Sequence, residues 1–360
     1  MSRIGFRGIL RLAARSLLLV LLSVVLALAA AEVVYRLQPV DLYRGELRQY
    51  NARQDLVASD SLPTVLFMGD SVTAGTRSYP TIIRRERPDL RVINAAIPGS
   101  SVLQANLVAP ARFSRFKPSV FVYQINVGND LVNLRYPVNW SRLSPARNLY
   151  WTVVHRARSV EYLNYKMGQA ARAREIDRLE RELEDTGRAL VDVSDTSCRY
   201  DFADFDPESY TLRIRLYLEA EPTLLDDQVL VSRARRREYE RMLQGLRELL
   251  AYCEPDSCAA FLLVVPHASQ VDAGYRDAMR RLGASIDPTP GSTADYPFVA
   301  GIRRHLRDSG MGHVQVLDAL PVLRDVERQG RHAYFLHDPH LNGCGQAALA
   351  RLVLTKVLRE

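Results

Sequence analysis

Two segments far apart in the sequence carry the residue types of nucleophilic catalysis. Gly69-Asp70-Ser71 follows a short apolar run, and His337-Asp338-Pro339-His340 lies close to the C-terminus. A free serine hydroxyl is a weak nucleophile, so it needs a neighbouring base that takes its proton. We therefore expect Ser71 to be the nucleophile and His340 to be its base.

Two further residues have the chemistry of an oxyanion hole, and each follows an apolar run of its own. Gly99 lets a substrate approach a backbone N–H closely because it has no side chain, and Asn129 supplies an amide donor. Together with the N–H of Ser71 they provide the donors that a carbonyl oxygen needs as it becomes tetrahedral. Each residue alone has an ordinary reading, as a turn, a helix cap or a surface histidine. Their order and their positions after successive runs favour one site.

The elements that must position these residues are apolar runs with the length of buried strands. Five such runs occur, namely those starting at Thr64, Arg91, Ser119, Ala260 and His313. Continuous apolar strands separated by helical segments predict a parallel sheet that is covered on both faces. Ligands of such sheets bind outside the carboxyl ends of the strands, where the candidate residues fall.

A long insertion, residues 131–235, separates the third and fourth strands. Residues 170–191 have the apolar stripe of an amphipathic helix. Residues 212–218 alternate between apolar and polar side chains, which predicts a strand paired with residues 189–193 in a small β-ribbon. Residues 233–252 predict the helix that leads into the fourth strand.

The sequence resembles the SGNH, or GDSL-like, hydrolase superfamily. Matching motifs are Gly69-Asp70-Ser71, Gly99, Asn129-Asp130 and the segment His340-Leu341-Asn342 with Gly345. They cover residues 64–130 and 260–357. The resemblance implies a flavodoxin-like three-layer α/β/α sandwich with a five-stranded parallel sheet. It also implies a serine esterase or acyltransferase in which Ser71 is the nucleophile, His340 the base, and Ser71, Gly99 and Asn129 the oxyanion hole.

Two positions depart from the motifs of this family. Glycine is shifted by one residue in Val127-Gly128-Asn129, and His337 stands where the family has the aspartate that precedes the base by three residues. Extracellular polysaccharide O-acetyltransferases of related fold use an Asp-x-His pair. Because the acid only has to reach the imidazole N–H, we expect Asp338 to orient His340. The role of His337 stays open.

A metal site is the competing interpretation of the histidine segment. Zinc needs a further ligand beyond His337, Asp338 and His340, and a metal there would leave Ser71, Gly99 and Asn129 without a role. A calcium site among the acids of residues 201–208 is a second alternative to a solvated loop, but the glycine and spacing of an EF-hand are missing. We expect no metal and no cofactor.

The N-terminus has the pattern of a membrane-targeting segment. Arg3, Arg7, Arg11 and Arg15 precede the apolar stretch 17–31. This pattern predicts a signal anchor in residues 1–35 with a cytoplasmic N-terminus, a tether in 36–62 and a catalytic domain in 63–360 outside the cytoplasm, as in a bacterial periplasm. A cleaved signal peptide is the alternative, which would release the domain to the same compartment.

The cysteines indicate disulfides, and the net charge bears on whether the protein binds nucleic acid. Cys198, Cys253, Cys258 and Cys344 would face an oxidising compartment, where disulfides form, and three pairings are possible. The pairs 253–258 and 198–344 are one of them. The net charge of +7 falls to +3 once the four N-terminal arginines are subtracted, which gives no support for nucleic-acid binding.

These features predict an extracytoplasmic ester hydrolase that removes small acyl groups from an envelope glycan or a similar ester. An O-acyltransferase that moves the acyl group to a glycan hydroxyl is the first alternative, and a non-catalytic glycan-binding scaffold is the second. The sequence does not specify an oligomeric state.

Overall fold

The computed structural model describes residues 6–51, 62–169, 198–287 and 296–358. The chain forms two compact units. Met1–Leu42 and Leu149–Leu190 make the first, and Tyr43–Asn148 and Val191–Glu360 make the second. The second unit contains all of the candidate site residues.

The first unit is built around helix α1 (Phe6–Leu37). The most apolar 18 residues within its stretch Arg11–Leu37 have a mean hydropathy of 2.8. Among the described residues this is the one helix long and apolar enough to cross a membrane. Its C-terminal part contacts the helical residues 158–169: Glu32 accepts a hydrogen bond from the Ser159 N–H at 2.9 Å, and the Tyr35 and Tyr162 rings pack at 5.7 Å. Helix α6 (Pro145–Arg156) leads into this segment.

The second unit is organised by a five-stranded sheet whose strands all run parallel. The strands are β1 (Thr64–Met68), β2 (Arg91–Asn94), β3 (Val120–Asn126), β4 (Ala259–Val265) and β5 (Gln315–Asp318). Their spatial order is β2-β1-β3-β4-β5, which is the flavodoxin-like order. The predicted three-layer fold and its strands are confirmed. Because the strand order reverses at β1 and β3, a crevice is expected outside the carboxyl ends of these two strands.

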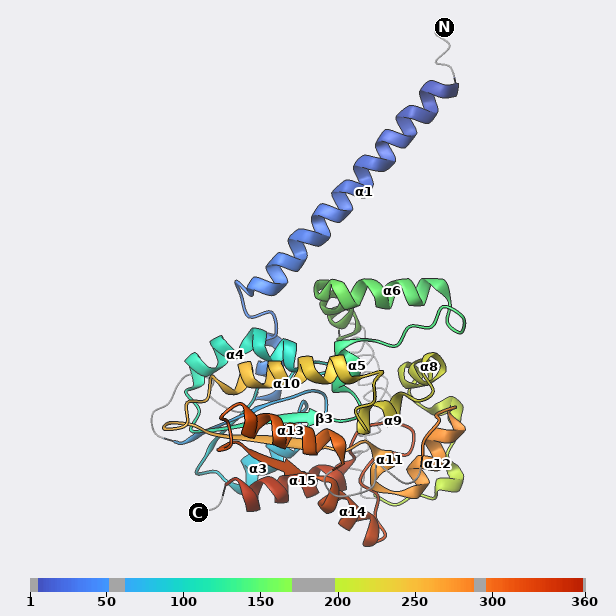
Figure 1. The fold of residues 1–360 in the computed structure, drawn as a ribbon. Coiled ribbons are helices and arrows are strands. Elements are labelled where there is room, and N and C mark those ends of the chain that lie inside the picture. Colours follow the sequence, from blue (N-terminus) through green and yellow to red (C-terminus); the bar gives the residue numbers. More distant parts are fainter. Residues whose placement is uncertain (1–5, 52–61, 170–197, 288–295, 359–360) are drawn as a thin grey trace, which may run out of the picture. The chain divides into compact units, whose positions relative to one another are not determined.

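Helices cover both faces of the sheet, as right-handed crossovers require. Helix α4 (Val102–Phe116) packs with α10 (Arg236–Leu250) on one face, together with α13 (Pro297–Asp308). Helix α3 (Tyr79–Glu86) packs with α15 (Gly343–Lys356) on the other, together with α14 (Leu320–Arg328) (Figure 1). Gly245 explains the close approach of α10 to α4, because a Cβ there would lie 2.8 Å from Val102. The predicted helix over 233–252 is confirmed as α10.

The described part of the insertion is helical where we predicted a strand. Its elements are α5 (Asp130–Leu134), α6, the 3-10 turns η1 (Phe202–Asp204) and η2 (Pro207–Ser209), α8 (Leu212–Ala220) and α9 (Leu224–Val229). The predicted strand over 212–218 is wrong, since α8 occupies it. Side chains two positions apart lie about 200° apart around a helix, so the alternation does not mark one helical face. The buried residues of α8 are instead Tyr217, Leu218 and Ala220, while Leu212 is exposed. The predicted partner strand 189–193 and the predicted helix 170–191 lie outside the described residues.

Two short helical segments, one before β1 and one after β4, also belong to the second unit. Helix α2 (Arg44–Tyr50) lies in the segment predicted as a tether, and the Asn51 that follows it exchanges hydrogen bonds with the backbone of Asn94 at the end of β2. Residues 44–51 are thus part of the folded unit. Helices α11 (Ala268–Val271) and α12 (Ala273–Arg281) follow β4.

Candidate active site

Ser71 lies in a tight turn directly after β1. The N–H groups of Thr73 and Ala74 donate to the Asp70 carbonyl, and α3 begins only at Tyr79. The turn packs closely on β3, because a Cβ on Gly69 would lie 2.6 Å from Gln124 Oε1. Gln124 Oε1 accepts hydrogen bonds from the Asp70 N–H and the Thr73 hydroxyl, so the glycine is needed for the turn to reach this acceptor.

His340 faces Ser71 across the carboxyl end of the sheet. Its Nε2 lies 2.8 Å from Ser71 Oγ. Its Nδ1 bonds to Oδ1 of Asp338, and the same oxygen accepts the backbone N–H of His340 at 2.9 Å. The structure therefore brings together the three residues that we expected to form a triad, and the Asp-x-His spacing is sufficient for contact. A serine hydroxyl in this arrangement can transfer its proton to the imidazole as it attacks a carbonyl.

The imidazole and the carboxylate are open to solvent on one side. The side chains of His340 and Asp338 are 41% and 40% exposed. Burial by itself would raise the pKa of Asp338, but hydrogen bonds from His340, the charge of His340 and a hydrogen bond from Thr211 outweigh it and hold the pKa below its usual value. Asp338 is thus ionised at neutral pH and can stabilise an imidazolium.

The loop that carries His340 is fixed by Asn342 and Gly345. Asn342, which is 1% exposed, accepts the N–H groups of Cys344 and Gly345 at the start of α15 and donates to the carbonyls of His332 and Tyr334. A Cβ on Gly345 would lie 2.2 Å from the Ala333 carbonyl oxygen, so only glycine fits there. The family-like segment after His340 is therefore explained by helix capping and close backbone packing.

Gln346 joins the nucleophile turn to the helix that follows the base loop. Its Oε1 accepts the Tyr79 N–H at 2.8 Å, and its Nε2 donates to the Val72 carbonyl at 3.0 Å. One side chain on α15 thus holds both ends of the segment between Ser71 and α3. Gln346 was not predicted from the sequence, although a glutamine among the apolar residues of a helix is a signal for a buried polar contact.

Gly99 and Asn129 lie beside the nucleophile turn. Gly99 has φ 68°, a left-handed conformation that favours glycine, and its neighbours Ile97 N–H and Ser100 hydroxyl both donate to the Gly69 carbonyl. The amide Nδ2 of Asn129 donates to Oδ2 of Asp70 at 3.2 Å. An amide nitrogen carries two hydrogens, so this bond fixes the group and leaves a second N–H for a ligand.

Two buried carboxyl groups, those of Asp70 and Asp130, accept hydrogen bonds from the segment that carries Asn129. Asp70 is 2% exposed, and burial raises its pKa although Val72, Asn129 and Asn126 donate to it. Asp130 is 3% exposed, and burial together with the charge of Asp70 raises its pKa well above the usual value. Asp130 accepts the Asn126 N–H at 2.6 Å, which closes the turn before Asn129. Neither role was anticipated from the sequence.

Gly128, the glycine that is shifted by one residue relative to the family motif, has a steric reason to be glycine. A Cβ on Gly128 would lie 2.6 Å from Cδ2 of His267, the residue that caps α11 after β4. The His267 ring is buried, which lowers its pKa to about 4, and its Nδ1 accepts the Ser269 N–H at 3.1 Å. A neutral imidazole therefore packs against the turn that presents Asn129.

His337 points away from the triad and into the insertion. Its Nε2 accepts the Asp206 N–H at 2.8 Å, and its ring stacks on Phe205 at 5.5 Å with an angle of 10°. Among the described residues no group of three or more His, Cys, Asp and Glu side chains is placed to hold a metal ion. The acids of 201–208 have other uses: Asp201 and Asp206 cap the two 3-10 turns, and Glu208 pairs with Arg215.

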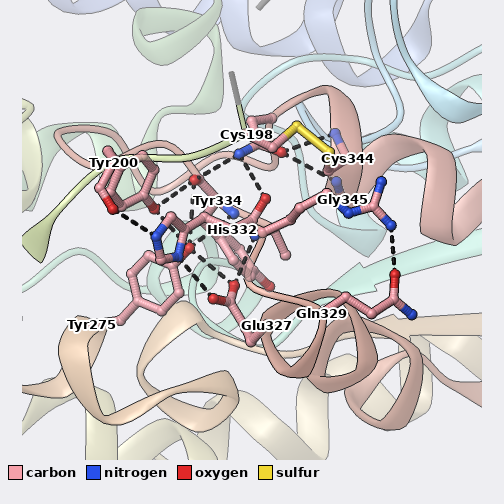
Figure 2. The surroundings of a disulfide bond; sticks show 12 residues. Cys198, Tyr200, Tyr275, Glu327, Gln329, His332, Tyr334, Cys344 and Gly345 are labelled. Atoms are coloured by element: carbon pink, nitrogen blue, oxygen red, sulfur yellow. Dashed lines mark hydrogen bonds and ion pairs between the residues drawn. A yellow bond between two sulfur atoms is a disulfide. The ribbon is translucent and has the colours of Figure 1, made fainter. Parts of the chain in front are cut away.

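A disulfide connects the insertion to the start of α15. Cys198 pairs with Cys344, and Cys253 pairs with Cys258, which is one of the three pairings that the sequence allowed. Figure 2 shows the polar groups around the first pair: His332 lies between the Glu327 carboxylate and the Tyr200 carbonyl, each 2.9 Å away, and the hydroxyl groups of Tyr200 and Tyr275 meet at 2.7 Å. Residues 198–200 are thus held by hydrogen bonds to His332 and Tyr334, which precede His340, and by the disulfide to Cys344, which follows it.

No family model and no curated protein matches this sequence. Solved structures that resemble it include Axe2, an acetylxylan esterase from Geobacillus stearothermophilus, at 13% identity and a TM-score of 0.36, with 84% of this chain and 97% of that chain covered. A catalytic mutant of the same enzyme aligns with a TM-score of 0.37 at 13% identity over the same shares of both chains. LAE5, an α/β hydrolase from the metagenome of Lake Arreo, Spain, aligns at 16% identity and a TM-score of 0.33, with 85% of this chain and 100% of that chain covered. At this level the likeness carries no argument about the reaction.

Proposed function

We propose that this chain is a serine ester hydrolase of the SGNH type. The observation that carries the proposal is the contact of His340 Nε2 with Ser71 Oγ at 2.8 Å while Nδ1 of the same ring is bonded to Asp338. Ser71 attacks the ester carbonyl as His340 takes its proton, and His340 then returns the proton to the departing alcohol. Water, activated by the same imidazole, releases the acid from the acyl-enzyme and regenerates Ser71.

The oxyanion that forms in each step is stabilised by hydrogen-bond donors beside Ser71. We assign this role to the N–H groups of Ser71 and Gly99 and to the second amide N–H of Asn129. Two features support the assignment: the left-handed backbone at Gly99 and the bond to Asp70 that orients the Asn129 amide.

The substrate that we propose is a small acyl ester on an envelope glycan. The half-exposed His340 and Asp338 suit an ester on a large alcohol, because such an alcohol can remain in solvent while its acyl group reaches Ser71. An acceptor hydroxyl can approach the acyl-enzyme along the same open side, which keeps acyl transfer as the second candidate. Both reactions share the Ser71 acyl-enzyme.

The location that we propose is outside the cytoplasm, with α1 as an uncleaved anchor. Its support is the apolar stretch Arg11–Leu37 after a basic N-terminus and the two disulfides, which persist in oxidising compartments. Membrane fractionation followed by N-terminal sequencing tests the anchor, and a soluble chain that starts after residue 29 would show cleavage instead.

Labelling by a fluorophosphonate tests the chemistry. The full-length protein in a mild detergent is expected to be labelled at Ser71 and to hydrolyse a chromogenic acetate ester, and Ser71→Ala is expected to lose both. Ser257→Ala is the control, since Ser257 is exposed in the turn between α10 and β4. Labelling at another residue would refute the assignment of the nucleophile. Full activity of Ser71→Ala in cells would favour a non-catalytic glycan-binding scaffold, and a rise in product with an added glycan acceptor would favour transfer.

A further inference from the structure

The segment 201–211 of the insertion reaches the triad through Thr211. Its hydroxyl donates to Oδ2 of Asp338 at 3.0 Å. Oδ1 of Asp338 already receives both N–H groups of His340, so Thr211 bonds to the other oxygen of the same carboxylate. Thr211 comes from a part of the chain that lies 127 residues away.

The Thr211 side chain bonds to Asp338 and does not cap its own helix. It occupies the N-cap of α8, where a threonine side chain ordinarily accepts an N–H of the first helical turn, and it makes no such bond. A residue that breaks a local rule is expected where function requires it. The hydroxyl is therefore committed to Asp338 instead of to its own helix.

His337 sets the register of this segment against the base loop. It accepts the Asp206 N–H through Nε2, its ring stacks on Phe205, and its carbonyl accepts the Thr211 N–H at 3.3 Å. The residue directly before the catalytic acid thus holds the insertion at both ends of the stretch 205–211. Its place in the sequence, one residue before Asp338, puts the Thr211 hydroxyl within reach of the carboxylate.

We propose that Thr211 is a positioning residue of the triad and that His337 holds the insertion so that Thr211 reaches Asp338. This inference rests on the proposed function. The carboxylate is held at both oxygens, by His340 on one and by Thr211 on the other. Rotation of Asp338 away from the imidazole therefore requires the loss of the Thr211 bond as well.

Replacement of Thr211 tests the proposal in the full-length protein. In Thr211→Val, kcat for a chromogenic acetate ester is expected to fall about tenfold, the lower end of what a hydrogen bond to a charged group contributes, because the site is half exposed. KM is expected to stay within about twofold, since Thr211 is assigned no substrate contact, and Thr211→Ser is expected to restore kcat to within about threefold. The low-field proton resonance of the His340–Asp338 hydrogen bond is expected to weaken in the valine variant.

Thr223→Val is the matched control. Thr223 is the N-cap of α9, makes no side-chain cap bond, and donates to Asp227 Oδ2 at 2.7 Å, so the same chemistry is removed away from the triad. Equal kinetics of Thr211→Val and Thr223→Val would overturn the proposal. A wild-type protein that neither hydrolyses the ester nor reacts with a fluorophosphonate would instead refute the proposed function.

A double-mutant cycle tests whether His337 acts through Thr211. His337→Phe keeps an aromatic ring against Phe205 and removes the acceptor for the Asp206 N–H. Its loss in kcat is expected to be smaller than that of Thr211→Val and to vanish in the Thr211→Val background. Fully additive losses would show that His337 acts by another route and would overturn that part of the proposal.

Discussion

The two disulfides close loops of very different length, and this difference makes their contributions to stability separable. Cys198–Cys344 spans a sequence separation of 146 residues, and Cys253–Cys258 spans 5. We consider two double variants, Cys198→Ala with Cys344→Ala and Cys253→Ala with Cys258→Ala. Each removes one cross-link and leaves the other in place.

The expected magnitudes follow from the chain entropy that each cross-link removes from the unfolded state. Loop-closure entropy gives about 5 kcal/mol for a separation of 146 and about 2 kcal/mol for a separation of 5. The difference depends only on the ratio of the two lengths: (3/2)RT ln(146/5) is about 3 kcal/mol. Alanine at all four positions keeps the loss of buried thiol volume similar in the two variants.

Urea unfolding of the full-length protein in a mild detergent, followed by intrinsic fluorescence, measures both variants against the wild type. The variant without Cys198–Cys344 is expected to unfold at a much lower urea concentration than the variant without Cys253–Cys258. Reduction of the wild type by a thiol should reproduce the sum of both losses. If the two variants lose equal free energy, or if the short loop contributes more, the entropic reasoning is refuted.

Three further predictions concern the site. Asn129→Ala is expected to lower kcat about 100- to 1,000-fold with little change in KM, as the loss of one oxyanion donor does, and equal kcat to wild type would remove Asn129 from the oxyanion hole. Gln346→Leu leaves the buried Tyr79 N–H and Val72 carbonyl without partners, so it should lower the free energy of unfolding by about 2 to 4 kcal/mol and slow the fluorophosphonate labelling of Ser71. Gln244 is an exposed glutamine on α10, and Gln244→Leu should have neither effect. Asp130 has a raised pKa in the folded chain, so its contribution to stability is complete below its unfolded pKa and is lost as pH rises. The free energy of unfolding of Asp130→Asn, measured in urea relative to wild type, should therefore increase from about pH 4 to about pH 7. A difference that stays constant with pH would contradict a raised pKa.

The sheet was predictable because its inner strands β1, β3 and β4 are apolar runs that both layers of helices bury, whereas the edge strand β5 is only half-buried. The burial of every residue of β1 and β2 is what such a run requires. The strand predicted over 212–218 failed because alternation over so short a run is a weak signal, and tertiary packing sets which of its side chains are buried. Only the packing of Tyr217 and Leu218 into the unit distinguishes the two outcomes.

The contact between Ser71 and His340 was predictable because the carboxyl ends of parallel strands converge, which brings Ser71 after β1 and the His340 loop after β5 to the same edge. The off-pattern acid was also predictable from reach alone, since Asp338 bonds to a ring two residues away. The role of His337 was not predictable. Its partners Phe205 and Asp206 have no sequence relation to it, and an aromatic next to an acid is common in any solvated loop.

By itself, the sequence determined the order of the strands along the chain, the apolar N-terminal helix, and the expectation that Ser71, Asp338 and His340 meet, which the structure shows they do. These properties are written in local patterns, namely hydrophobic period, glycine at turns and spacing within one loop. The tertiary structure decided which cysteines pair, that Gln346 holds the nucleophile turn, and that Thr211 bonds to Asp338. Such contacts join residues more than a hundred positions apart, and their formation depends on how two packed surfaces meet, which no local pattern encodes.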